Sequence, residues 1–239
     1  MELYNEDCLI GIKRVKDNSV DLVFCDLPYG CTGCEWDNKI DLNELSKELW
    51  RVAKEETPIV FTATLHFGLE IIDAMGRGNL KYEMIWDKGH STTPFLAKVR
   101  PMKRHELVLV FYKKQPKIYK RKIEEHHDKF TTTPARDKPG VFVSRPSWDT
   151  EGNVKKTYEK KLPTSVLNIK NGSKKLNSTQ KPVEIIEFFI QYYTDEGGLV
   201  LDPTFGSGSS AVACKNQNRK FVGFELNEDQ YKSAVKRLN

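Results

Sequence analysis

The chain has 239 residues, 38% of them hydrophobic, which is enough for one large α/β domain with an insertion or for two small domains. Its formal net charge of +5 is mildly basic, so a polyanionic partner is implied only where the positive charges cluster. The acidic N-terminus shows no secretory signal, and the longest apolar-rich run, 185–193, is too short to span a membrane. Composition therefore excludes the membrane-spanning and secreted classes and predicts a cytoplasmic protein.

The cysteines point the same way. Five are scattered along the sequence, and the Cys31-x-x-Cys34 pair has no second pair to complete a zinc site. Free thiols in a reducing cytosol explain this pattern better than a disulfide framework. We therefore expect no metal centre.

Strands and helices alternate at both ends of the sequence. Runs of β-branched and aromatic residues predict seven strands, at 3–5, 20–25, 58–63, 80–86, 106–112, 199–201 and 221–224. Helical periodicity and capping residues predict helices at 41–52, 67–75, 183–193, 209–216 and 227–238. This alternation predicts an α/β fold with a doubly wound, mostly parallel sheet.

The middle of the sequence has a different character. From Lys113 to about residue 176 it is polar, with Pro and Lys throughout and only short apolar runs. Such a stretch is typical of an insertion rather than of a sheet core. We therefore divide the chain into 1–112, the insertion 113–176, and 177–239, with the first and last parts forming one domain.

A buried strand ends abruptly at Asp26-Leu27-Pro28-Tyr29. In open α/β sheets the carboxyl edge of the strands is where ligands bind. Pro28 fixes its own φ and restrains Leu27, so the carbonyls before it point in a restricted direction. A carboxylate, an oriented carbonyl and an aromatic face suit a planar amino group. The alternative is a strand that happens to end in a turn containing Pro and Gly.

A second strand, 199–201, runs into a glycine-rich turn, Asp202-Pro203-Thr204-Phe205-Gly206-Ser207-Gly208, before the helix that starts at Ser209. Glycines let a backbone pass close to a ligand. Glu225 follows 23 residues after Asp202, beyond the next strand, where an acid can accept bonds from ribose hydroxyls. Asp202 could accept from an ammonium group or a water. The alternative is a tight turn plus a surface glutamate.

The two motifs together resemble those of the DNA amino-methyltransferases, which methylate the exocyclic nitrogen of adenine or cytosine. The order, catalytic motif first and S-adenosylmethionine motif last, is similar to the β group of that family. Further matches are Asn177 to Pro182, Glu225 and the pair Asp7-Cys8. The resemblance implies a Rossmann-like methyltransferase sheet, with 1–112 as its catalytic half and 177–239 as its cofactor half.

The resemblance also implies the catalytic chemistry. The carboxylate of Asp26 and the carbonyl of Leu27 would accept the two N–H bonds of the target amino group, which stabilises positive charge as the methyl arrives. Pro28 restrains this loop and Tyr29 would stack on a base flipped out of the duplex. The family pattern often has Pro where this chain has Leu27, which predicts looser positioning of the carbonyl. No step needs a metal.

The matching residues would hold the cofactor as follows. Lys181 would face the carboxylate of S-adenosylmethionine, Glu225 its ribose, and Asp7, beside Cys8, its adenine amino group. The turn after the strand 199–201 would line the methionine side, through Asp202, Phe205, Gly206, Gly208 and Ser209.

A basic run follows the catalytic half. Between residues 98 and 122 ten lysines or arginines stand against one acid, Glu106. This density suits phosphate contacts; the alternative is a solvated lysine-rich face. We interpret 113–176 as the target-recognition region and predict nucleic-acid contacts from Lys98, Arg100, Lys103, Arg104, Lys113, Lys114, Lys120, Arg121 and Lys122.

The predicted function is a site-specific DNA methyltransferase that acts on adenine N6 rather than cytosine N4, because cytosine N4 enzymes of the family more often carry Ser at the position of Asp26. Four alternatives stay open: cytosine N4, an RNA substrate, a protein amide substrate, and a nucleic-acid-binding relative that has lost catalysis. The expected partner is duplex or single-stranded DNA, with a cognate restriction endonuclease as a further candidate. The sequence is compatible with a prokaryotic or phage source and with a monomer or a homodimer.

Overall fold

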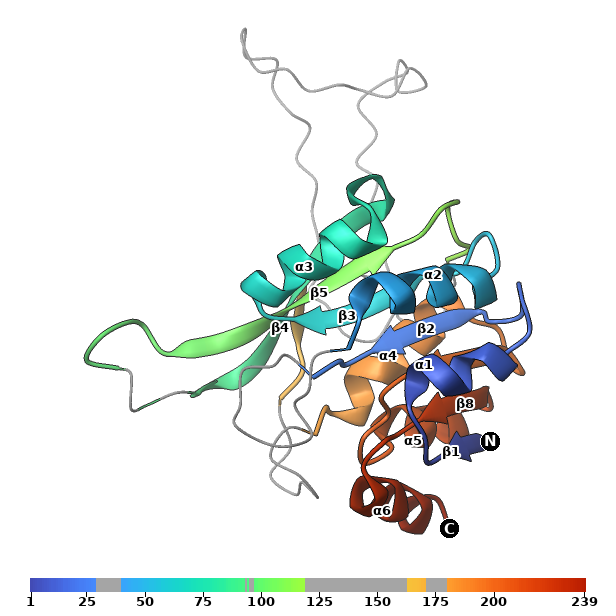
Figure 1. Cartoon of the computed structure of the whole chain (residues 1–239). Helices are drawn as coiled ribbons and strands as arrows, with labels where there is room; N and C mark the ends of the chain where they lie inside the picture. Colours follow the sequence, from blue (N-terminus) through green and yellow to red (C-terminus); the bar gives the residue numbers. More distant parts are fainter. Residues whose placement is uncertain (29–39, 93, 95–96, 119–162, 171–179) are drawn as a thin grey trace, which may run out of the picture. The chain divides into compact units, whose positions relative to one another are not determined.

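The computed structural model describes residues 1–28, 40–92, 94, 97–118, 163–170 and 180–239 (Figure 1). By contacts the chain divides into two units. Unit 1 comprises Met1–Tyr119 and Thr164–Asn239, and unit 2 comprises Lys120–Pro163. The fold below is that of unit 1, because nearly all of unit 2 lies outside the described residues.

Unit 1 is built on one sheet of eight strands in the order β1-β8-β7-β2-β3-β5-β4-β6. Among the described strands, β5 runs antiparallel to its neighbours β3 and β4, and the other pairs are parallel. The bounds are β1 Glu2–Tyr4, β2 Leu22–Cys25, β3 Ile59–Ala63, β4 Leu80–Thr92, β5 Lys103–Phe111, β6 Val166–Asn168, β7 Leu199–Asp202 and β8 Lys220–Phe224.

Helices cover both faces of the sheet (Figure 1). One hydrophobic core lies between the sheet and α1–α3, and a second lies between the sheet and α4–α6. The strands of the centre are buried on both faces, as β2 shows with four fully buried residues. The bounds are α1 Cys8–Gly11, α2 Leu42–Val52, α3 Leu65–Met75, α4 Val183–Tyr193, α5 Ser209–Asn216 and α6 Glu228–Leu238, with 3-10 turns at Ile12–Arg14 and Arg77–Asn79.

The predicted α/β fold with a doubly wound, mostly parallel sheet is confirmed, and one detail is corrected. The sheet has eight strands where we expected seven, because Val166–Asn168 pairs in parallel with Ile85–Asp87. This segment lies inside the range that we assigned to the insertion. It buries one side chain, Leu167, so it carries too little apolar sequence to be distinguished from a loop.

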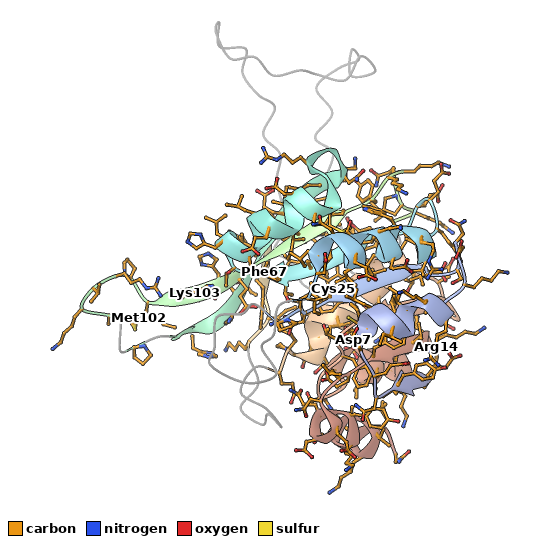
Figure 2. All side chains as sticks on the ribbon, viewed as in Figure 1. Asp7, Arg14, Cys25, Phe67, Met102 and Lys103 are labelled. Carbon is orange, nitrogen blue, oxygen red and sulfur yellow. The ribbon has the colours of Figure 1, made fainter. Side chains whose placement is uncertain are left out.

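The predicted strands 80–86 and 106–112 form a longer hairpin than expected. β4 continues to Thr92 and β5 begins at Lys103, and they pair with an irregularity between Asp87 and Thr92. The far part of the hairpin carries polar residues on both strands, which is why periodicity alone placed it in a loop. Figure 2 shows Met102 and Lys103 on the part of this hairpin that extends away from the helices.

Candidate active site

The two predicted motifs meet at the carboxyl edge of the sheet. β2 and β7 are parallel neighbours, with Leu22 opposite Val200, so the loops that follow them emerge side by side. From this point the chain continues to β3 on one side and to β8 on the other, which makes it the switch point where doubly wound sheets bind ligands. The hydroxyl of Thr204 donates to the carbonyl oxygen of Asp26 at 3.1 Å and joins the two loops.

The carboxylate of Asp26 is held by two side chains from other elements. The hydroxyl of Thr62, on β3 and fully buried, donates to Oδ1 of Asp26 at 2.6 Å. The ammonium of Lys181 lies 2.7 Å from the same oxygen, and the side chain of Asp26 keeps 26% of its surface exposed. Asp26 is therefore oriented from inside the protein while part of it still faces solvent.

The rest of the catalytic motif is only partly described. Leu27 is buried, with 3% of its surface exposed, and Pro28 lines the larger of two cavities described below. Tyr29 lies outside the described residues, so its predicted stacking role stays a prediction.

Asp202 holds the shape of the glycine-rich turn. It is buried at the end of β7; Oδ1 accepts the backbone N–H of Thr204 at 3.0 Å, and Oδ2 accepts the hydroxyl of Ser210 at 2.5 Å. Burial raises the pKa of Asp202 to about 7, against the lowering effect of these two hydrogen bonds. One carboxylate oxygen thus bonds to the turn and the other to the start of α5, and this structural role was not part of the sequence prediction.

The turn requires its glycines. Gly208 has a φ of +81°, a conformation that other residues rarely adopt. A Cβ atom there would lie 2.9 Å from the Cβ of Ala234 on α6. Glycine therefore lets the start of α5 approach α6 closely. Ser209 then donates its hydroxyl to the carbonyl of Lys181 at 2.8 Å, which fixes the segment before α4 beside the turn.

Glu225 follows β8 and bonds to the same turn. Oε2 accepts the backbone N–H of Gly206 at 2.9 Å and Oε1 accepts that of Asn227 at 2.8 Å. Burial raises the pKa of Glu225, and the backbone hydrogen bonds oppose this rise. Each carboxylate oxygen has a second lone pair, so Glu225 can still accept a hydrogen bond from a ligand hydroxyl group.

A cavity of about 400 Å³ lies beside Glu225. It brings together five of the predicted residues with others that sequence reasoning missed. Asp7, which accepts the N–H of Leu9 at 2.7 Å as the cap of α1, is one of the former. The lining residues are Asp7, Cys8, Pro28, Ile40, Pro203, Thr204, Gly206, Glu225, Leu226, Asn227, Glu228 and Gln230.

A smaller cavity of about 60 Å³ lies on the other side of the turn. Thr204, Gly206 and Gln230 line both cavities, so the two are adjacent. The small cavity joins Asp26 and Lys181 to the turn residues Phe205, Gly206, Ser207 and Ser209. The two cavities thus bring Asp26 and Pro28 of the catalytic motif together with most of the predicted cofactor residues; Gly208 lines neither cavity and packs against Ala234.

Three residues that contact Asp26 or Lys181 were not assigned to the site from the sequence. Thr62 lies in a strand whose residues are all buried, and Thr204 is a position of the glycine-rich turn to which we had given no role. Glu106 carried one signal, since it is the single acid in the basic run 98–122. Its carboxylate lies 3.3 Å from the ammonium of Lys181, which we expected to face a cofactor.

Of the residues predicted to contact nucleic acid, those that the structure describes lie at two opposite edges of the sheet. Lys98, Arg100 and Arg104 are exposed and Lys103 is partly exposed, all on the β4–β5 hairpin, which begins at the edge where Asp26 lies. Because β5 is antiparallel, Lys113 and Lys114 emerge at the opposite edge. There the ammonium of Lys114 lies 3.0 Å from Glu56, and that of Lys113 lies over the Trp50 ring.

The two lysines at 113 and 114 therefore do not belong to a surface around the site, because the direction of β5 carries them away from it. The remaining predicted contacts, Lys120, Arg121 and Lys122, lie outside the described residues.

Within the described part of the chain, no three His, Cys, Asp or Glu side chains gather closely enough to hold a metal ion. Likewise, the helices that the structure describes are all too short or too polar to cross a membrane.

Known proteins are similar to this chain over almost its whole length. A profile of the family N6_N4_Mtase, described as DNA methylase, matches residues 20–236. The type II methyltransferase M.HpaI of Haemophilus parainfluenzae is 26% identical over 241 residues, which cover 96% of this chain and 71% of that protein.

Two solved structures share the fold. The PvuII DNA methyltransferase, described as cytosine-N4-specific, has a TM-score of 0.73 at 16% identity and covers 99% of this chain and 86% of that one. A complex of M1.HpyAVI with SAM has a TM-score of 0.63 at 21% identity and covers 99% and 98%. With the profile match across nearly every residue, the chain belongs to the N6/N4 family of DNA methylases.

Proposed function

We propose that this chain transfers a methyl group from S-adenosylmethionine to the exocyclic amino nitrogen of a DNA base, adenine N6 in preference to cytosine N4. One observation carries the proposal. Asp26 lies in the same cavity as the glycine-rich turn after β7, at the switch point of the sheet. A carboxylate beside such a turn can accept hydrogen bonds from an amino group and stabilise the positive charge that develops during methyl transfer.

The lining residues fit the cofactor in two parts. The larger cavity, at about 400 Å³, is of the size that nucleoside ligands occupy, and it presents the carboxylates of Asp7 and Glu225 to amino and hydroxyl groups. The small cavity would take the amino-acid part, where the ammonium of Lys181 can pair with a carboxylate. When bound, the cofactor supplies an activated methyl group on a sulfonium.

The chain's own residues would then handle the base. An exocyclic amino group is conjugated with its ring, so its nitrogen is a poor nucleophile. It becomes nucleophilic when its N–H groups donate hydrogen bonds to suitably oriented oxygens. The carboxylate of Asp26 and the carbonyl of Leu27 supply these acceptors, and Thr62 and Thr204 hold the carboxylate and the adjoining carbonyl in place. The target base would have to flip out of the DNA double helix to reach these two acceptors.

The choice of adenine rests on Asp26, where cytosine N4 members of the family more often have Ser. The likeness to a cytosine-N4-specific enzyme keeps cytosine N4 as the second candidate. DNA as substrate is supported by the family and by the exposed basic residues of the hairpin, which start at the edge of the site. RNA and protein-amide substrates of the same fold are outcomes of the test below.

We keep target recognition as the proposed role of the insertion 113–176, of which the structure describes 113–118 and 163–170. The relative M.HpaI is a type II methyltransferase, which supports a search for an endonuclease that reads the same sequence.

Labelled methyl transfer tests the function. The chain is incubated with tritiated S-adenosylmethionine and, in parallel, duplex DNA, single-stranded DNA, RNA or bulk protein. We expect incorporation into DNA, with N6-methyladenine as the product on nucleoside analysis. N4-methylcytosine would select the second candidate, label in RNA or protein would replace the proposed substrate, and no transfer with retained cofactor binding would favour a non-catalytic relative.

Replacing Glu225 by glutamine should weaken binding of S-adenosylhomocysteine by about 10- to 100-fold, since hydrogen bonds to a charged group contribute about 1.5–3 kcal/mol. The amide cannot accept at both of its ends, so either Gly206 or Asn227 also loses its partner. Titration calorimetry measures the change. Glu184→Gln, an exposed acid at the start of α4, is the matched control and should bind as wild type does. Unchanged affinity in Glu225→Gln would remove Glu225 from the ribose site.

A further inference from the structure

Four charged side chains of alternating sign lie in a row beside the small cavity. The ammonium of Lys88 is 2.5 Å from Oε1 of Glu106, Oε2 of Glu106 is 3.3 Å from the ammonium of Lys181, and that ammonium is 2.7 Å from Oδ1 of Asp26. The side chains of Lys88, Glu106 and Lys181 are only 10–12% exposed. The proposed methyl transfer uses Asp26 and Lys181 and gives no role to the other two.

Glu106 is the rigid member of this row. It lies on β5 opposite Trp86 of β4, and Lys88 follows two residues later on β4. Both lysine ammonium groups lie within 6 Å of the Trp86 ring centre, at 5.2 Å and 5.9 Å. Burial alone would raise the pKa of Glu106, but the ammonium groups of Lys181 and Lys88 outweigh it and lower that pKa. Glu106 is therefore a fixed negative charge in the sheet.

Lys181 is held less firmly by Glu106 than by Asp26. It lies outside the sheet, before α4, and its long side chain reaches both carboxylates. The contact with Asp26 is short, whereas the contact with Glu106 is 3.3 Å and lacks the angle of a hydrogen bond. Among the described residues, Oε2 of Glu106 has no hydrogen-bond donor although it is buried. A buried acceptor without a donor costs free energy of folding, and this oxygen is close enough to accept a hydrogen bond if the Lys181 ammonium moves toward it.

We propose that Glu106, anchored by Lys88, is a positioning residue that draws the Lys181 ammonium away from Asp26 when substrates bind. The inference rests on the proposed function. A base amino group needs the Asp26 oxygen that Lys181 occupies, and a cofactor carboxylate needs a cation. Glu106 lets one lysine meet both needs, because the ammonium stays paired after it leaves Asp26. The four side chains also sum to zero charge, so this row adds no net positive charge near the nitrogen on which positive charge develops.

The substitution Glu106→Gln gives the proposal an unusual signature. The row then carries one net positive charge, and Lys181 keeps its contact with Asp26 but loses the one with Glu106. A ligand carboxylate should bind more tightly. The kcat should fall by about tenfold or more, because Lys181 stays on the Asp26 oxygen that the base amino group needs and because one uncompensated charge lies a few ångströms from the reacting nitrogen. A purely structural role would weaken binding and turnover together.

Binding is measured by calorimetry with two ligands, S-adenosylhomocysteine, which has the amino-acid carboxylate, and 5′-methylthioadenosine, which lacks it. In Glu106→Gln the preference for S-adenosylhomocysteine over 5′-methylthioadenosine should increase, and kcat for methyl transfer to DNA should decrease. Glu83→Gln, which removes an exposed carboxylate from the neighbouring strand β4, is the control and should change neither value.

The double variant Lys88→Met/Glu106→Gln covers the case in which the single variant folds poorly. It removes the Lys88 ammonium together with the Glu106 carboxylate, so neither charge is left buried without its partner. Its ligand preference should return toward the wild-type value because the row is neutral again, while kcat stays low because Glu106 no longer offers Lys181 a carboxylate away from Asp26. Recovery of kcat in this variant, or a reduced preference with reduced kcat in Glu106→Gln, would overturn the proposal. Failure of the wild type to bind either ligand would instead reject the proposed function.

Discussion

Asp26→Ala is expected to lower kcat for methyl transfer by about 100- to 1,000-fold, the usual cost of removing one group that stabilises charge in a transition state. The physical reason is that the amino nitrogen loses the carboxylate that accepts its N–H and balances its developing charge. The Leu27 carbonyl remains, so some transfer persists. Cofactor affinity should be largely retained, because the turn that lines the cavity is held by Asp202 and Glu225.

The chain offers a matched control at the other end of the same strand. Asp21 precedes β2, is 31% exposed on its side chain, and has a lysine partner, since the ammonium of Lys54 lies 2.5 Å from Oδ1. Asp21→Ala therefore removes an equally paired carboxylate that lies far from the site. We expect it to lower the free energy of unfolding and to leave kcat unchanged. If Asp26→Ala keeps wild-type turnover while binding S-adenosylhomocysteine normally, the catalytic role of Asp26 is wrong.

The second large effect concerns stability and pH. Burial raises the pKa of Asp202 from its ordinary value of 3.8 to about 7. The folded state therefore holds a proton on Asp202 that the unfolded state releases. The stabilisation from this proton is complete below pH 3.8 and is lost as the pH rises through about 7. The slope is about 1.4 kcal/mol per pH unit, so the loss amounts to at most about 4 kcal/mol.

Asp202→Asn should remove this dependence. The amide keeps an acceptor for the N–H of Thr204 and can donate to the hydroxyl of Ser210, so the turn retains its bonds. Relative to wild type, the variant should gain stability between about pH 4 and pH 7 and then level off toward pH 8, in urea denaturation followed by circular dichroism. Asp229→Asn, an exposed acid on α6, should follow the wild-type curve. A constant difference between Asp202→Asn and wild type across this range would show that Asp202 is ionised in the folded protein throughout.

Much of the fold and the centre of the site could be read from local patterns. Strands such as β2 and β7 are buried on both faces, so they appear as short apolar runs, and each ends in an acid at the carboxyl edge. Glycine in the turn before α5 signals a close approach that no other residue permits, and Gly208 shows it against Ala234. Since parallel strands share one carboxyl edge, these two loops could be expected to meet.

Other features depend on which strands become neighbours. β6 buries a single leucine and is a strand only because β4 lies beside it. The basic run looked continuous, but antiparallel β5 places its two ends at opposite edges of the sheet. No local pattern in the sequence encodes this direction.

By itself, the sequence determined the α/β fold and the family motifs, and it predicted Asp26, Asp202 and Glu225, which line adjacent cavities, as site residues. Only the tertiary structure decided what the charges around them do. It placed Lys181 between Asp26 and Glu106, and Lys88 behind Glu106. Propensity and periodicity report on neighbours along the chain, whereas ion pairs join side chains that are 18 to 155 residues apart, and only the order of the strands brings them within 4 Å.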